Sequence, residues 1–517
     1  MPVLPANPKY IRFEKILRIA SMLLVVILVW QPGIVFARAG DNGFEGGISS
    51  GYVEGRETFE YKEVVFVTGK PVLFTGTLTI KKTVRQGEIR STYTYNLQNA
   101  EHNATLRRSA VYDTAIEEKG SQVIEKTVLS RTPSESIVIS GTVYNLQSID
   151  FSRSNIIDKK VAVNYFAGNV WSRKVYSVAG TGARITVELN GELYGYEQYW
   201  GTTETGKYNI YYQYEDYTRE KPEIWGGSAV LNISSNTSKS IEYIENIPNQ
   251  ISFDGGFIET QHNTSVLEYR YEMPEFDKDG ISTDNLIKGN GFANLETYPV
   301  QSRLRVPNIN HLRGHWAYKD IMTLYSLEVF QGDEAFFKPE KYITRAEFAD
   351  AIIKAARKVP EEQASQRRTT TTRRRTVEEE KISPFVDVPK DHAYFESIYE
   401  AYERGLMSGT GTGYFYPDAT ITTADALCIF IRALGLENLG PGDVAVTVFR
   451  DNDQIPGYAR NAAYVAKRIG LVEGDSRGYL NPNENLTKGR AAAMLNRFIN
   501  YMREDIKVDY TKSIIGF

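Results

Sequence analysis

The 517-residue chain has a single cysteine, Cys428, and only five histidines. One cysteine excludes an intrachain disulfide and a cysteine-rich metal site, so stability has to come from burial and hydrogen bonding. The chain also has no large excess of either charge. It contains 60 Lys and Arg and 64 Asp and Glu residues, which gives a net charge of -4. Such a chain has no general electrostatic reason to bind nucleic acid or anionic lipid, and we expect neither as a partner.

An apolar run near the start of the chain, Ile19–Trp30, follows four basic residues and precedes Ala37-Arg38-Ala39. Small residues at both alanine positions are what a signal peptidase reads, so we expect residues 1–39 to be a secretory signal peptide. The run is shorter than the ~20 apolar residues of a spanning helix, and Gln31-Pro32-Gly33 interrupt its extension. The absence of a nearby cysteine excludes a lipid anchor there. We expect an exported chain with no membrane partner after cleavage.

Helical periodicity is nearly absent between residues 56 and 300. Tyr208, Ile210 and Tyr212 alternate with other residues, which is the two-residue period of a half-buried strand. The 34 tyrosines and 41 glycines suit a β-sheet with many turns. We expect residues 40–304 to form a mostly antiparallel β domain, either a sandwich or a long twisted meander. A chain of 517 residues is too long for one core, so further domains should follow.

After about residue 305, helical patterns and glycine-containing loops replace the strands. Three segments share one internal spacing: Trp316–Gly332, Ala393–Gly409 and Tyr458–Gly474. In the loop after each segment a proline lies five residues before a threonine, in the pairs Pro339 and Thr344, Pro417 and Thr422, and Pro482 and Thr487. This matched spacing predicts three helix-loop-helix repeats, at residues 305–359, 383–441 and 442–508, with a tail at 509–517.

Residues 360–382 separate the first two repeats and contain the run QASQRRTTTTRRRTVEEEK. This run has almost no apolar residue to bury, so we expect a solvated linker. Its arginines are followed at once by three glutamates and have no interleaved aromatic residues. We therefore do not expect the linker to bind nucleic acid.

The helix predicted after Thr344 has a well-specified start, because Thr344 and Glu347 form a capping box. Arg345 lies at the first helical position, where a positive charge is unfavourable for the helix alone. Free backbone amides, the helix dipole and a guanidinium would together form an anion site, since a carboxylate accepts two parallel bonds from arginine. The alternative is a solvated surface arginine. The third repeat has Lys488 at this position, whereas the second has Thr423 and keeps only hydroxyls.

These residues resemble the repeats of the S-layer homology family, a triplicated module that attaches surface proteins to the envelopes of many bacteria. The resemblance covers about residues 305–508. It rests on the motifs His315-Trp316-Ala317, Phe385-Val386-Asp387-Val388, Phe449-Arg450-Asp451 and Ile343-Thr344-Arg345-Ala346-Glu347. It implies an all-α spindle of pseudo-threefold symmetry. Grooves between its repeats would bind a secondary cell-wall polymer attached to peptidoglycan, pyruvylated or otherwise acidic.

The resemblance also implies which residues bind this polymer. Basic residues would pair with the acidic sugar, aromatic residues would offer ring faces, aspartates would accept sugar hydroxyls, and glycines would let the backbone approach. The basic residues are Arg345 and Lys488, with Thr344 at the cap. The aromatic residues are Trp316 and Tyr458, the aspartates are Asp387 and Asp451, and the glycines are Gly332, Gly409 and Gly474. We expect Arg345 to contribute more than Lys488, because it alone combines a complete capping box with a guanidinium. Departures from the family pattern predict unequal grooves; they lie at Asn310, Glu328, Ala393, Thr423 and Arg490.

Two further patterns give weaker candidates. His311 and His315 lie four residues apart, but no glutamate follows the first histidine as a zinc protease motif requires, so we expect a structural role. Asp277, Asp279 and Asp284 flank a glycine and are candidate calcium ligands, although this glycine comes too early for a helix-loop-helix calcium site. We expect no other metal and no cofactor.

The sequence therefore predicts a secreted bacterial surface protein, bound non-covalently to the cell wall and displaying a β-rich structural or binding module. The alternative is a wall-anchored enzyme acting on a polysaccharide. That enzyme would need a groove in the β region with two carboxylates about 5 to 10 Å apart. We expect no enzymatic activity, and self-association through the β region stays open. The different periodicities of residues 40–300 and 305–508 predict that the two parts fold independently.

Overall fold

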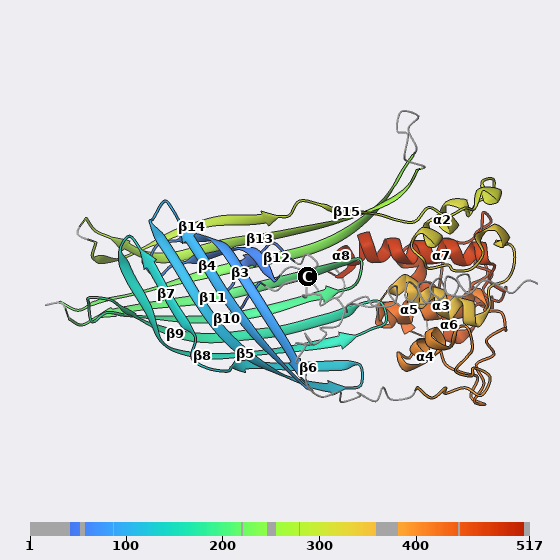
Figure 1. Ribbon diagram of the computed structural model, residues 1–517, viewed down its shortest axis with the longest axis horizontal. Coiled ribbons are helices and arrows are strands. Elements are labelled where there is room, and N and C mark those ends of the chain that lie inside the picture. The colour runs from blue at the N-terminus through green and yellow to red at the C-terminus, as the bar shows by residue number, and fades with distance from the viewer. Residues whose placement is uncertain are drawn as a thin grey trace, which may run out of the picture.

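The computed structural model describes residues 42–51, 57–85, 87–218, 221–245, 255–278, 280–357, 381–442 and 445–510. The predicted signal peptide and nearly all of the predicted linker lie outside these ranges. The chain has two parts, a β region (residues 42–304) and a helical region (residues 305–510), which lie end to end along the long axis (Figure 1).

The β region forms one antiparallel sheet of 15 strands. Its strands are β1 (Ile48–Ser49), β2 (Thr58–Val65), β3 (Val72–Arg85), β4 (Glu88–Asn99), β5 (Ala104–Lys119), β6 (Gln122–Leu129), β7 (Ser134–Ile139), β8 (Thr142–Lys159), β9 (Asn164–Val178), β10 (Arg184–Glu197), β11 (Gly201–Asp216), β12 (Glu223–Ile244), β13 (Gly256–Phe276), β14 (Ser282–Glu296) and β15 (Val300–Arg303). Most strands pair with their sequence neighbours, while β7 pairs with β5 and β8, and β15 pairs with β13. The predicted antiparallel β region is confirmed, and its form is the long meander.

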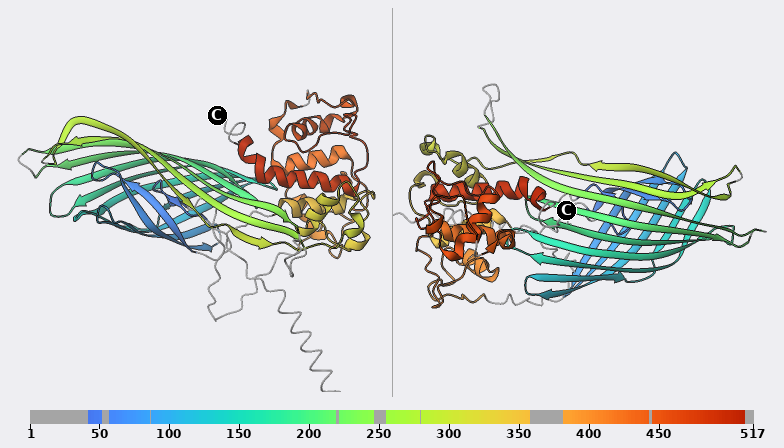
Figure 2. Two further views of the ribbon diagram at one scale, coloured as in Figure 1. Left: turned by 90° about the horizontal axis from the view of Figure 1, so that it is seen from above. Right: turned by 180° about the vertical axis from the view of Figure 1, so that it is seen from behind.

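The sheet curls until its first strands cross its last strands, as the blue and yellow-green ribbons of Figures 1 and 2 show. Lys62 on β2 donates to the carbonyl oxygen of Asn294 on β14 at 2.9 Å. The curl encloses a hydrophobic core. On β11, Tyr208 and Ile210 are 0% and 3% exposed, whereas Tyr211 is 54% exposed, so the predicted alternation is confirmed.

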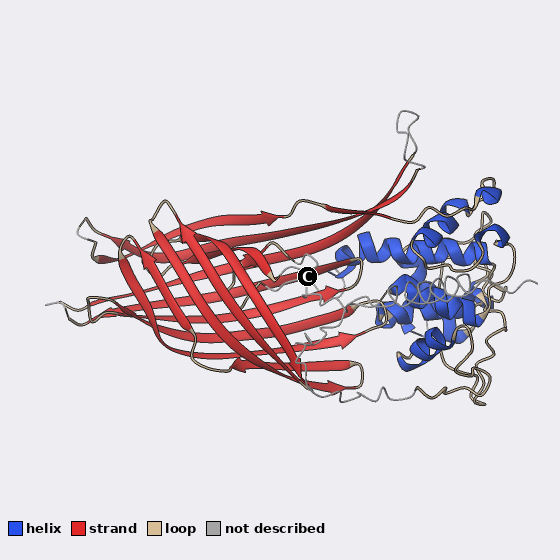
Figure 3. Ribbon diagram, in the orientation of Figure 1, coloured by secondary structure: helices blue, strands red, loops and turns tan. Residues whose placement is uncertain are grey.

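The helical region carries the helices that the repeat spacing predicts (Figure 3). Its longer helices are α2 (Tyr318–Ser326), α3 (Arg345–Ala356), α4 (Phe395–Glu403), α5 (Thr423–Leu434), α6 (Gly457–Arg468) and α7 (Lys488–Asn500). Its shorter ones are η1 (Asn310–Leu312), η2 (Glu334–Phe336), η3 (Glu437–Leu439), η5 (Asn452–Gln454), η6 (Tyr501–Asp505) and α8 (Ile506–Asp509). The last helix passes the expected boundary at residue 508, because Tyr510 is buried and stacks on Tyr165 of β9.

Helices of different repeats pack in a closed ring. The first helix of one repeat packs against the second helix of another: α4 on α3, α6 on α5, and α2 on α7. Polar bonds accompany this packing, since Ser397 of α4 donates to Asp350 of α3 at 2.6 Å and Asn496 of α7 donates to Asp320 of α2 at 2.7 Å. Within the described residues, no helix has the length and hydropathy required to cross a membrane.

Two turns of the β region enter the core of the helical region. Val161, Ala162 and Trp200 are 0 to 3% exposed and belong to the same hydrophobic cluster as α3, α5 and α7. The two parts therefore share a core, which the sequence did not predict when it separated them at about residue 304.

Candidate functional site

The N-termini of α3, α5 and α7 form the centre of the candidate site. The predicted capping box of α3 is confirmed, since Thr344 Oγ1 accepts from the Glu347 amide at 3.2 Å and the Glu347 carboxylate accepts from the Thr344 amide at 3.1 Å. A second capping box joins Thr422 and Asp425 at α5, and this helix has Thr423, not a basic residue, at its first position. The Asp425 side chain is one methylene shorter than that of Glu347, but its carboxylate still accepts from the N-cap amide, that of Thr422.

The first two amides of each of these helices are bonded to the loop of another repeat. Arg345 and Ala346 of α3 donate to the carbonyls of Ala419 and Pro417. The other two helices repeat this pattern: Thr423 and Ala424 donate to Glu484 and Pro482, and Lys488 and Gly489 donate to Lys341 and Pro339. The expected anion site made of free amides is therefore wrong, because the protein's own carbonyls occupy them.

Arg345 is half-buried in the loop of the second repeat. Its Nε donates to the carbonyl of Phe415 at 2.9 Å, its Nη2 donates to the carbonyl of Ser408 at 3.0 Å, and its guanidinium lies 4.8 Å from the Phe415 ring centre. Burial lowers the pKa of Arg345, while Asp425 and Asp387 oppose this shift. The parallel fork that a carboxylate ligand would use is therefore engaged within the protein.

An open groove lies beside the starts of α3 and α4. All three repeats contribute to it, and its lining residues are Val329, Phe330, Gln331, Phe337, Ile343, Glu347, Asp350, Tyr394 and Lys488. Phe330 and Phe337 supply an apolar wall, while Lys488, at the first position of α7, supplies a cation. We call this the α3–α4 groove.

Internal bonds neutralise the carboxylates of the α3–α4 groove. Glu347 accepts from Lys488 Nζ at 2.6 Å, and Asp350 accepts from Lys354 at 2.6 Å. Lys488 has three donors, and one serves Glu347 in the bonds of the described residues. Its side chain is 18% exposed, so an entering ligand can reach it. The groove therefore offers the remaining donors of Lys488 beside an aromatic wall.

Tyr394 lines the α3–α4 groove and was not predicted from the sequence. Ala393 aligns with Trp316 and Tyr458, so the second repeat was read as lacking its aromatic residue, although the signal lay one position further on. Burial, with Glu347 and Asp350 nearby, raises the pKa of Tyr394.

The two aromatic residues that the sequence did assign both lie exposed outside this groove. Trp316 is 63% exposed beside the ring of His315, and Tyr458 is 64% exposed. The Tyr458 hydroxyl donates to Asp425 at 2.8 Å, and burial together with this bond raises its pKa to about 12. The structure thus places the assigned aromatic residues at different helix starts.

The two assigned aspartates hold loops. The carboxylate oxygens of Asp387 accept from the amides of Phe415 and Tyr416 at 2.8 and 2.7 Å. Asp451 accepts in the same way from the amides of Leu480 and Asn481 at 2.9 and 2.7 Å. These bonds give both aspartates a loop-holding role, and their role as sugar acceptors stays a prediction.

The three assigned glycines differ from one another. A Cβ on Gly409 would lie 2.7 Å from the Phe385 ring, and one on Gly474 would lie 3.1 Å from the Phe449 ring, so close packing explains both. Gly332 has a φ of +104° and open space where a side chain would be. It alone of the three keeps room for a ligand.

The weaker candidates have structural partners. His315 accepts from the Ala317 amide through Nδ1 at 3.1 Å and bonds Glu340 through Nε2, which confirms the expected structural role. Asp277 accepts from the Ile281 amide at 2.9 Å, whereas Asp279 lies outside the described residues. No cluster of three or more acidic, histidine or cysteine side chains suited to a metal ion, Asp284 included, occurs in the described part of the chain.

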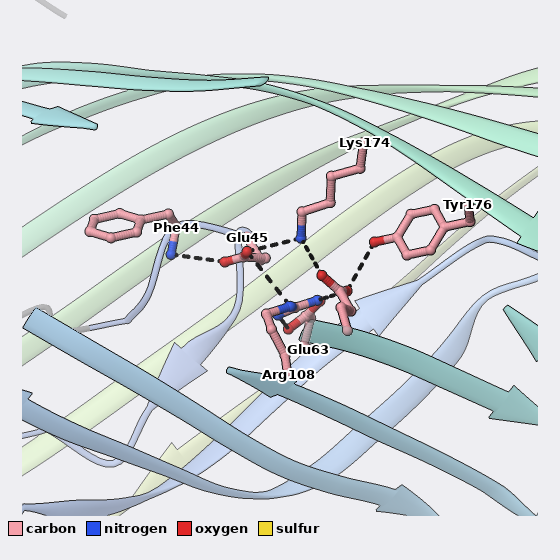
Figure 4. A network of polar contacts seen from close by, with 7 residues as sticks. Phe44, Glu45, Glu63, Arg108, Lys174 and Tyr176 are labelled. Atoms are coloured by element: carbon pink, nitrogen blue, oxygen red, sulfur yellow. Dashed lines mark hydrogen bonds and ion pairs between the residues drawn. The ribbon is translucent and has the colours of Figure 1, made fainter. Parts of the chain in front are cut away.

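A buried network of charges lies inside the curled sheet (Figure 4). Arg108 on β5 pairs with Glu63 at 2.9 Å and with Glu135 at 2.7 Å, and Lys174 on β9 pairs with Glu135 at 2.9 Å and Glu45 at 3.0 Å. Burial alone would raise the pKa of Glu135, but the charges of Arg108 and Lys174 lower it to about 2. These side chains are 0 to 10% exposed. Their carboxylates converge on cations in the interior, where no polysaccharide could reach them.

These features define a class of protein: a long β module fused to a closed ring of helical repeats with a groove between the repeats. The S-layer homology domain model matches residues 308–349 and 384–427. The chain therefore carries S-layer homology repeats, and these repeats anchor it at the bacterial cell surface.

Similar proteins carry both surface-layer and enzyme names. The chain is 28% identical over 215 residues to the surface-layer 125 kDa protein of Lysinibacillus sphaericus, covering 41% of this chain and 16% of that one. It is 27% identical over 188 residues to an amylopullulanase of Thermoanaerobacterium thermosulfurigenes (36% and 9%) and 30% identical over 186 residues to an endoglucanase of Bacillus sp. strain KSM-635 (36% and 18%). The chain spans between 9% and 21% of the length of the curated relatives it matches.

Proposed function

We propose that the helical region binds an acidic secondary cell-wall polymer, pyruvylated or otherwise negatively charged, and so holds an exported chain to the peptidoglycan. The observation that carries the proposal is Lys488, a partly exposed cation in a groove with two neutralised carboxylates and an aromatic wall. A sugar ring can pack on the partly exposed Phe337 while its acidic group meets the ammonium. The S-layer homology match supports this class of ligand.

We assign the main contact to Lys488 and a supporting structural role to Arg345, which reverses the order expected from the sequence. The Nε and Nη2 donors that form the fork of Arg345 serve carbonyls, whereas Lys488 lines the groove and is bonded to Glu347 through one of its donors in the described residues. Gly332, at the rim of the same loop as Gln331, would let a ligand pass close to the backbone. Thr344 contributes by positioning Glu347.

We further propose that the three repeats form a pseudo-threefold spindle. The cyclic order of helix contacts and the matched amide bonds of α3, α5 and α7 support this symmetry. The grooves beside Arg345 and Thr423 would then be weaker versions of the α3–α4 groove, because one has its cation engaged and the other has none.

We propose a structural or binding role for the β region, and we rank an enzymatic role below it. Support comes from the surface-layer relatives and from the buried charge network, whose three carboxylates are occupied by Arg108 and Lys174. The enzyme names among the relatives concern much longer proteins of which this chain covers at most about a fifth.

Calorimetric titration of the full chain with purified acidic wall polymer tests the site. Lys488→Ala should weaken binding by about tenfold or more, because a hydrogen bond to a charged group contributes about 1.5 to 3 kcal/mol. Part of this loss would come from the freed Glu347 carboxylate, so adding Glu347→Gln should recover some affinity, since glutamine also completes a capping box.

The matched control is Lys319→Ala, which removes an exposed lysine of α2 that does not line the groove. It should leave affinity within about twofold. Equal effects of the two lysine substitutions would mean that binding depends on overall charge, and the assignment of the α3–α4 groove would fail.

A further inference from the structure

The later residues of α3 and α5, and of η6 after α7, contact the β region, which lies beside the helical region in Figure 2, whereas the first residues of α3, α5 and α7 lie at the candidate site. A helix leaves its last four carbonyls without partners in the helix. Donors of the β region reach carbonyls at the ends of α3 and α5 and in η6, which continues α7. Trp200 Nε1 donates to Ala355 of α3 at 3.2 Å, the Ala162 amide donates to Ala433 of α5 at 2.9 Å, and the Gln198 side chain donates to Met502, just past α7.

These donors come from two turns, residues 160–163 between β8 and β9 and residues 198–200 between β10 and β11, which we call the plug turns. Turns normally lie on the surface and are polar. The plug turns instead carry Val161, Ala162, Val163 and Trp200, all at most 3% exposed. A fully buried tryptophan in a turn indicates that the turn belongs to a core.

A stack of aromatic rings and cations holds the second plug turn. Lys239 Nζ lies 3.6 Å from the ring centre of Tyr199, and the Arg357 guanidinium lies 4.4 Å from the same ring. Arg357 also donates to the Tyr199 hydroxyl at 2.7 Å. Its φ of +50° is rare for a residue with a side chain, so these contacts hold a strained backbone in place.

We propose that the plug turns are needed for the anchor. They complete the core of the helical region and make the β region and the helical region one rigid body. The helix starts that form the groove and the helix ends that receive the plug turns are separated by the 12 residues of α3, about 18 Å. If the groove binds wall polymer, as proposed above, the sheet is then held pointing away from the wall. The inference itself concerns rigidity and stands without that proposal.

Distances between two spin labels on the full chain test the proposal without any wall polymer. One label replaces the exposed Lys221, just before β12 at the far end of the sheet, and the other replaces the exposed Asp391 before α4. The background is Cys428→Ser, which removes the single native thiol. The otherwise unchanged chain should give one narrow distance distribution, and Trp200→Ala should broaden it severalfold and split a single thermal transition into two.

Trp171→Ala is the matched control, because Trp171 is 38% exposed on β9 and away from the plug turns. It should leave the distribution narrow. Arg357→Ala is a milder second variant, useful where Trp200→Ala fails to fold, and it should broaden the distribution without opening the core. A broad distribution in the parent chain, or narrow distributions in both Trp200→Ala and Arg357→Ala, would overturn the proposal.

Discussion

Arg108→Met should remove about 3 to 5 kcal/mol from the free energy of unfolding of the β region. Three carboxylates, those of Glu45, Glu63 and Glu135, surround Arg108 in the interior, and Lys174 alone would then remain to balance them. Breaking a buried ion pair by removing one partner leaves an uncompensated charge, which is why this cost exceeds that of most core substitutions. Denaturant unfolding of the full chain at pH 7, followed by tryptophan fluorescence, measures the loss.

The double variant Arg108→Met with Glu63→Met is the control for this expectation. It removes one carboxylate together with the cation, so it should be more stable than Arg108→Met alone. A loss of less than about 1 kcal/mol for Arg108→Met would show that the network does not stabilise the curled sheet.

Asp451→Ala should cost about 3 kcal/mol or more in the helical region. Asp451 is 3% exposed, and its two carboxylate oxygens accept from the amides of Leu480 and Asn481. Each hydrogen bond to a charged group contributes about 1.5 to 3 kcal/mol, and both donors would lose their partner. Denaturant unfolding followed by circular dichroism at the helical band measures the loss.

Asp451→Asn separates the loop-holding role from a ligand role. Asparagine keeps one acceptor oxygen, so this variant should fold, and its affinity for wall polymer should stay within about twofold of the parent chain. A folded Asp451→Asn variant that no longer binds polymer would support the role that the family resemblance implied for this aspartate.

The sequence predicted local structure well where a short-range pattern carries the information. The alternation of Tyr208, Ile210 and Tyr212 identified a strand, and the threonine and glutamate of the Thr344 capping box identified a helix start. The equal spacing from Trp316 to Gly332 and in the two later segments identified the repeats. The first two patterns lie within one strand and one helix start, and the third appears when three 17-residue segments are compared.

Long-range partners could not be predicted in this way. The amides of Arg345 and Ala346 bond carbonyls more than 70 residues away, and nothing near them in the sequence marks those partners. Glu45, Glu63 and Lys174 read as ordinary surface charges until the curl of the sheet brings them together around Arg108. Because the carbonyl partners of Arg345 could not be predicted, the sequence indicated that its guanidinium was free to bind a ligand.

The shared core shows a second limit. Trp200 lies among tyrosines and glycines and carries no sign of its position, because its partner Ala355 belongs to a helix more than 150 residues later. Dividing the chain by periodicity near residue 304 was sensible locally. This division did not predict the plug turns, because apolar residues in a turn are only a weak indication of burial in a single sequence.

Attachment to the wall is the central claim. The most direct test is co-sedimentation with purified wall sacs, using the full chain without the predicted signal peptide at 1–39. Sacs that carry their acidic polymer should pull the chain into the pellet, and sacs from which that polymer has been stripped should leave it in the supernatant. Retention should also fall as salt rises, because the contact at Lys488 is ionic. Equal retention on stripped and unstripped sacs would contradict the account, since the chain would then bind peptidoglycan without the polymer.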